Sequence, residues 1–156
     1  MKLSSLRLTI AVPSWRGSRT VFLTDRASHF HVALENISEH PIRLWSEACS
    51  WGYEALSFEM QTPHGIVSIK RKPIHWKQNT PDFILLNPTE LQIFDIYCAT
   101  EEWQHFPLPS PLHSRTILLR AVYLVSTEPL SRQYNVWSGR LTSDWVPLLL
   151  VNHLVS

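Results

Sequence analysis

Alternation of apolar and polar residues with a period of two runs through most of this chain, and it constrains the fold more than any other feature. In HFHVALEN, residues 29–36, Phe30, Val32 and Leu34 fall on one side of an extended chain and the residues between them on the other. No window long enough for a helix keeps apolar positions at i, i+3, i+4 and i+7 without a proline or a strand pattern intervening. The sequence therefore predicts an all-β chain with almost no helix.

The alternating segments are separated by turn-forming residues, which gives about seven to nine predicted strands. After residues 29–36 these segments are 42–45, 53–60, 66–72, 83–86, 91–96, 115–125, 136–143 and 145–151. The segment 115–125 is apolar on both faces apart from Arg120, which is typical of a central strand. Pro147 cannot donate a ladder hydrogen bond, so it is expected to confine the last strand to a sheet edge.

Strands of this number and length, with one long crossover, predict an immunoglobulin-like Greek-key β-sandwich of two antiparallel sheets, formed as a single domain over residues 1–156. TPHG, residues 62–65, should connect a hairpin whose second strand buries Val67 and Ile69. In CSWGYEALSFE, residues 49–59, we expect Gly52 at the strand entry to permit a positive φ or a close backbone approach. The residues expected in the core are Phe30, Val32, Leu34, Leu56, Phe58, Leu119 and Tyr123.

Composition narrows the function classes. Fourteen Lys and Arg against thirteen Asp and Glu give a net charge of +1, which lacks the basic excess of a nucleic-acid-binding protein. No run approaches the ~20 apolar residues of a membrane helix, and residues 8–12 are too short for a signal segment, so we expect a cytoplasmic protein. Cys49 and Cys98 are then expected to be reduced, with a disulfide between them as the alternative.

Motifs for catalysis are sparse, and we expect no enzyme activity and no cofactor. His29 and His31 form an H-x-H on one strand face, about 7 Å apart, where they could share a metal ion in a metal-binding protein or enzyme. No spacing marks a third ligand, so solvent-facing histidines are the favoured explanation. A blue-copper site using Cys49 and Met60 lacks the close Cys, His and Met grouping, and neither cysteine has a recognisable base for nucleophilic catalysis.

Two surface features suggest binding. Lys70, Arg71 and Lys72 lie close to Trp76 in the sequence, which could offer positive charge and a stacking face to a partner. An edge strand protected by lysines is the alternative explanation. Trp76 and Trp103 fall in predicted loops, as does Trp15, where such rings could bind a carbohydrate or a peptide, or fold back as lids over the core.

Four segments resemble small bacterial immunoglobulin-like domains, in particular the BsuPI-type intracellular proteinase inhibitors: FHVALENISEHPIRLW, LSFEMQTPHGIVSIKRK, LLNPTELQIFDI and TILLRAVY. Two turns carry the likeness, with Thr89 where that family has glycine. The matching turn residues are Asn36, Ser38, Pro41, Leu86, Pro88 and Glu90. The resemblance implies an immunoglobulin-like fold and, as one option, inhibition of a proteinase.

Together these features predict a non-catalytic binding or protein-interaction module. Its expected partner is an unknown protein rather than nucleic acid or a membrane, and proteinase inhibition is one form that this interaction could take. A carbohydrate- or peptide-binding module using loop tryptophans is one alternative. A metal-binding protein or enzyme using His29 and His31 is the other.

Overall fold

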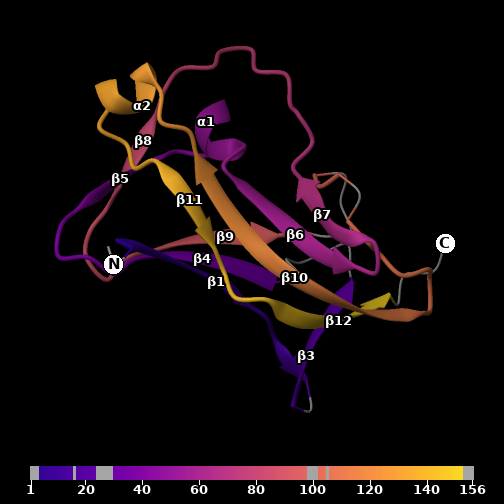
Figure 1. The fold of residues 1–156 in the computed structure, drawn as a ribbon. Helices are drawn as coiled ribbons and strands as arrows, with labels where there is room; N and C mark the ends of the chain where they lie inside the picture. The colour runs from indigo at the N-terminus through magenta and orange to yellow at the C-terminus, as the bar shows by residue number, and fades with distance from the viewer. Residues whose placement is uncertain (1–3, 16, 24–29, 98–101, 105, 153–156) are drawn as a thin grey trace.

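The computed structural model describes residues 4–15, 17–23, 30–97, 102–104 and 106–152 (Figure 1). Within these ranges two short helices, α1 (Ser50–Tyr53) and α2 (Pro129–Gln133), interrupt residues that are otherwise strand and loop. The strands are β1 (Leu6–Ala11), β2 (Ser14–Trp15), β3 (Ser18–Leu23), β4 (Phe30–Asn36), β5 (Ile42–Trp45), β6 (Leu56–Thr62), β7 (Gly65–Lys70), β8 (Phe83–Leu86), β9 (Leu91–Ile96), β10 (Ser114–Val125), β11 (Gly139–Thr142) and β12 (Val146–Asn152). The prediction of an all-β chain is confirmed.

The described strands outnumber the seven to nine that were predicted, because β1, β2 and β3 lie in N-terminal residues where no strand was expected. In β1 the signal was present, since Leu6, Leu8 and Ile10 alternate with polar residues and all three are buried. None of the helices in the described part of the chain is long and apolar enough to cross a membrane.

Three sheets are present among the described residues. One is a three-stranded antiparallel sheet in the order β1-β4-β9, and a second pairs β5 with β8. The largest has the order β2-β3-β12-β10-β6-β7, with β11 also paired to β10. The prediction that both sheets are purely antiparallel is wrong, because β3 and β12 run parallel. Side-chain alternation has the same period in either kind of pair, so the sequence pattern alone does not report strand direction.

The long strand β10 is central, as predicted. Its residues 119–123 pair with β6, 114–119 with β12 and 122–125 with β11 (Figure 1). The prediction that Pro147 places its strand at an edge is wrong, because β12 lies between β10 and β3. Pairing between β12 and β3 begins at Leu149, two residues after the proline, so its missing N–H interrupts no bond to β3.

The core forms where the three-stranded sheet faces the largest sheet. Aromatic rings span this interface: Phe30 meets Phe58 at 5.7 Å and Phe94 meets Tyr123 at 6.3 Å between ring centroids. All seven side chains predicted for the core are buried. Val67 is the exception among the predicted buried positions, with 42% of its surface exposed, because only Ile69 is buried in β7 and the strand's first four residues extend into solvent.

The two turns that carry the family resemblance meet in space. Asn36 is fully buried, and its side-chain amide donates to the carbonyl oxygens of His40 and Leu86, both at 2.8 Å. Its Oδ1 accepts the backbone N–H of Ser38 at 2.9 Å, and its carbonyl accepts the N–H of Thr89 at 2.9 Å. Asn36 therefore links the turn between β4 and β5 to the turn between β8 and β9.

A β-bulge separates β11 from β12. Ser143 pairs with Ala121, whose N–H donates to Ser143 Oγ at 2.8 Å, while the next ladder pair is Val146 with Leu119. Asp144 and Trp145 therefore both stand opposite the single residue Arg120, whose guanidinium lies 4.4 Å from the Trp145 ring centroid. The extra residue turns the Asp144 side chain away from the regular alternation of the strand.

The segment CSWGYEALSFE begins with a helix rather than at a strand entry. Gly52 lies inside α1, where an added Cβ would sit 2.0 Å from the carbonyl oxygen of Ser46. Close backbone approach, and not a positive φ, is therefore the reason for glycine at this position. The ring centroids of Trp51 and Trp45 lie 5.6 Å apart, so α1 packs against β5 and this segment has a structural role.

Candidate functional site

Arg71, predicted as part of an exposed basic patch, points into the protein. Its side chain is 6% exposed and makes ion pairs with Glu47 at 2.7 Å and Glu102 at 3.3 Å. Its guanidinium lies 4.7 Å from the ring centroid of Tyr53 and 5.2 Å from that of Trp103. Strand alternation separates this buried cation from Lys70 and Lys72, which remain exposed. The three basic residues therefore do not form one patch.

Trp103 is buried, which excludes it as an exposed binding platform. Its ring packs edge-on against Phe58 at 5.0 Å, in agreement with the alternative that loop tryptophans fold back over the core. The segment 102–104 also pairs with the end of β7: Lys72 N–H donates to Glu102 O and Gln104 N–H to Lys70 O, both at 2.8 Å. The sheet edge at Lys70 to Lys72 is thus already occupied by the chain itself.

Trp76 is half-buried and lies edge-on to Tyr53 at 5.9 Å. The Tyr53 hydroxyl donates to the carbonyl of Lys72 at 3.2 Å, which ties the aromatic pair to the strand. Burial raises the pKa of Tyr53 and also that of the Glu102 carboxyl, and in both cases the Arg71 cation opposes the rise. The ion pairs and ring contacts of Arg71 join α1 and the segment 102–104 to the end of β7, and this cluster is called the internal clamp below.

Of the predicted metal-binding pair, the structure describes His31 but not His29. His31 Nδ1 lies 2.8 Å from Asp95 Oδ1, and His29 lies outside the described residues. Within the described ranges no group of three or more His, Cys, Asp or Glu side chains is placed to hold a metal ion. Cys49 is a free, buried thiol that donates to Ser46 O at 3.2 Å, and Cys98 lies outside the described residues.

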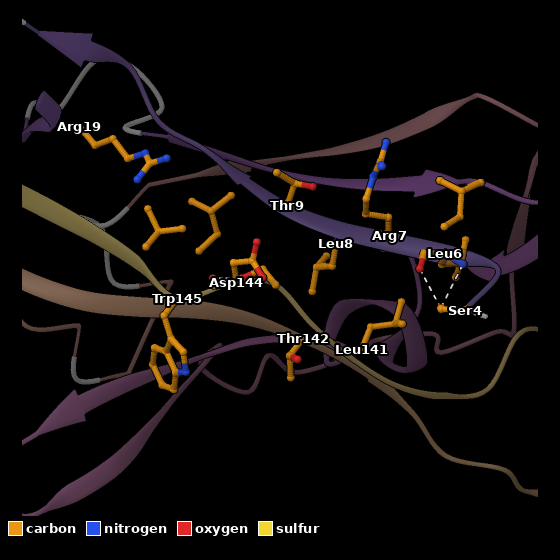
Figure 2. Close-up of a pocket in the computed structure, with 14 residues that line it drawn as sticks. Ser4, Leu6, Arg7, Leu8, Thr9, Arg19, Leu141, Thr142, Asp144 and Trp145 are labelled. Carbon is orange, nitrogen blue, oxygen red and sulfur yellow. Dashed lines mark hydrogen bonds between the residues drawn. The ribbon is translucent and has the colours of Figure 1, made fainter. Parts of the chain in front are cut away.

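A groove of about 530 Å³ runs between β1 and the bulged segment of residues 141–146 (Figure 2). This volume is within the usual range for ligand sites in proteins. Leu8 and Leu141 point toward each other across it, and the labelled residues show that both walls run in the same direction (Figure 2). The groove is therefore a slot between two strand edges, one from each layer of the fold.

Backbone groups on the β1 wall of the groove are open. Ile37 N–H donates to Ser5 O, so in this antiparallel pair Arg7 and Thr9 direct their backbone groups to β4. Leu6, Leu8 and Ile10, the alternate residues, direct theirs to the groove. Ser4 Oγ caps Leu6, donating to its carbonyl at 2.8 Å and accepting its N–H at 3.3 Å (Figure 2). Among the described residues no backbone group pairs with Leu8 or Ile10 on this side.

Two exposed charges stand at the other end of the groove. Arg19 extends from β3 and Asp144 from the bulge, and Figure 2 shows both on the side of the groove opposite Ser4. Arg7 also lines the groove, but its guanidinium pairs with Glu35 on β4. No side chain in the described part of the chain pairs with Arg19 or Asp144, so these two charges can bind groups of a ligand.

No known family, curated protein or solved structure matches this chain. The groove and its charges must therefore be interpreted from their geometry alone.

The sequence analysis did not single out Arg19, Asp144 or the β1 edge. The alternation of Leu6, Leu8 and Ile10 could have identified β1 as a strand. The position of Asp144 depends on a one-residue change of register between β11 and β12, and no local pattern marks it.

Proposed function

We propose that this chain is a non-catalytic protein-interaction module with an immunoglobulin-like Greek-key arrangement of its strands, and that it binds an extended segment of a partner protein in the groove beside β1. The observation that carries this proposal is the open edge of β1 inside the groove, where the backbone groups of Leu8 and Ile10 have no partner among the described residues. Backbone N–H and C=O groups are obligatory hydrogen-bonding groups, and an extended peptide is the ligand that matches a strand edge.

The side chains around this edge indicate which side chains the bound segment of the partner should carry. The exposed Ile37 and the half-buried Leu141 give the groove an apolar floor above Leu8, which suits apolar side chains at alternate positions of an added strand. Arg19 and Asp144 suit a segment that carries both an acidic and a basic group near one end. Main-chain hydrogen bonds would supply affinity, and the apolar floor and the two charges would supply specificity.

The BsuPI-type resemblance adds a class of partner. If the chain shares the inhibitory role that this resemblance implies, the bound segment belongs to a proteinase. The test of a proteinase partner is to measure inhibition of a panel of purified proteinases by the parent chain and by the groove variant described below.

Selection of peptides from a random library on the purified chain tests the proposal. Leu141→Trp enlarges the side chain that points into the groove (Figure 2), and Gln133→Trp, at an exposed position of α2, is the matched control. We expect selected peptides to lose at least tenfold in affinity for Leu141→Trp and to keep their affinity for Gln133→Trp. The amide resonances of Leu8 and Ile10 should shift when peptide binds. Equal affinity for both variants, or no shift at β1, would overturn the proposal.

A further inference from the structure

The outer edge of β9 is a further open strand edge among the described residues, and it lies apart from the groove. β9 is the last strand of the sheet β1-β4-β9 among the described residues. Leu91 is 52% exposed and Ile93 is 49% exposed, and both lie on the outer face of this sheet. Asn36 N–H donates to Glu90 O, so the even-numbered residues face β4 while Leu91, Ile93 and Asp95 direct their backbone groups outward.

This edge lacks the features that usually keep strand edges apart. The sequence of β9, LQIFDI, contains no lysine, proline or glycine, and its register with β4 continues without a bulge from Leu91 to Ile96. The edge of β7 does have such protection, because Lys70 and Lys72 lie at its end and the segment 102–104 pairs with it there. The one charge on β9, Asp95, lies 2.8 Å from His31 of the neighbouring strand. An apolar edge of this kind favours pairing with another strand.

We infer that β9 pairs with β9 of a second copy of this chain, in an antiparallel arrangement about a two-fold axis at Gln92. In this register Leu91 stands opposite Ile93 of the second copy, and Ile93 opposite its Leu91, because a two-fold interface is self-complementary. The outward backbone groups of these residues form the ladder bonds. The two three-stranded sheets join into one continuous sheet with the four apolar side chains together on its outer face.

Charge placement favours this register and this partner. Asp95 stands opposite Thr89 of the second copy, and the two Asp95 residues are separated by six strand positions, or roughly 20 Å. That separation exceeds the Debye length of about 8 Å at physiological salt, so the like charges do not oppose association. An axis at Ile93 would pair the two Ile93 residues but place each Asp95 against the Leu91 of the other copy, which desolvates the carboxylate.

Sedimentation velocity on the full chain over a range of concentrations tests the inference. We expect a concentration-dependent monomer–dimer equilibrium that Ile93→Lys weakens at least tenfold. Ile66→Lys is the matched control, because Ile66 is a similarly exposed apolar residue on the β7 edge, and it should leave the equilibrium unchanged. Thermal unfolding checks that both variants fold.

Amide hydrogen exchange locates the contact. The amides of Leu91 and Ile93 should exchange more slowly as the concentration of the chain rises, because they become ladder donors in the dimer. A chain that stays monomeric up to millimolar concentration would overturn the inference, as would a dimer that Ile93→Lys leaves intact. Neither Leu91 nor Ile93 lines the groove, so this test and the peptide selection fail or succeed separately.

Discussion

The guanidinium of Arg71 connects two parts of the chain that are distant in sequence, the region of α1 and the segment 102–104. It contacts Glu47 before α1, the ring of Tyr53 in α1, and Glu102 and Trp103 in the segment that covers β7. A buried cation in this setting has both counterions and aromatic faces around it, so its removal takes one cationic partner from each of two carboxylates.

Arg71→Leu should therefore lower the free energy of unfolding by about 3 kcal/mol, the usual cost of removing one member of a buried ion pair. Lys72→Leu, at the exposed neighbouring position, should change it by no more than about 0.5 kcal/mol. Urea unfolding of the two variants measures the difference. Equal effects would mean that Arg71 does not act as an internal clamp.

Thr89 has a φ of 70°, a left-handed conformation that is costly for a residue with a branched Cβ. Glycine relieves about 1–2 kcal/mol of this strain but loses about 0.5–1 kcal/mol through the greater freedom of the unfolded chain. We expect Thr89→Gly to stabilise the protein by about 0.5–1 kcal/mol in thermal or urea unfolding. Thr89→Ala keeps a Cβ and is the control, so a glycine variant no more stable than the alanine variant would contradict the argument.

At the scale of elements, the turn between β8 and β9 depends on the ionised form of Glu90. Its carboxylate accepts the N–H of Asn87 at 2.8 Å and a side-chain bond from Asn87 at 3.1 Å. The backbone bond from Asn87, followed by the side-chain bond, lowers the pKa of Glu90 below its ordinary value of 4.5. The turn is therefore stabilised by the charged carboxylate and not by the neutral acid.

Because the folded-state pKa of Glu90 is depressed, its contribution is present above the unfolded pKa near 4.5 and is lost as pH falls through the lower folded-state pKa. Glu90→Gln should be less stable than the parent chain at pH 6, and the difference should shrink below pH 4.5. Urea unfolding at several pH values measures this trend. A difference that is constant with pH would show that the charge of Glu90 is not involved.

At the scale of the whole molecule, Phe58 connects the two layers and the covering segment. Its ring meets Phe30 at 5.7 Å, Trp103 at 5.0 Å and Phe106 at 6.3 Å, and it is fully buried. We expect Phe58→Ala to lower the free energy of unfolding by about 4 kcal/mol, as for other large core truncations. Phe22→Ala, on the partly exposed face of β3, provides the comparison and should cost much less in the same urea titration.

Strand positions and core residues could be predicted because they depend on local pattern. Period-two alternation identified β4 and β6, since a half-buried strand must direct every second side chain into the core, and a segment apolar on both faces identified the central strand β10. The same pattern does not report which strands become neighbours. The parallel pairing of β3 with β12, and the interior position of β12 despite Pro147, depend on long-range connections.

The candidate site was the least predictable feature, for a physical reason. Lys70, Arg71, Trp76 and Trp103 were chosen for their chemistry, but burial decides whether such groups can meet a partner, and the fold buried Arg71 and Trp103 together. The groove instead arises where the edge of β1 meets the bulge at Asp144, which are more than a hundred residues apart in the chain. The sequence by itself determined an all-β chain and its core, because alternation is local. Only the tertiary structure decided which edges remain open, because an edge is defined by the absence of a neighbour in space.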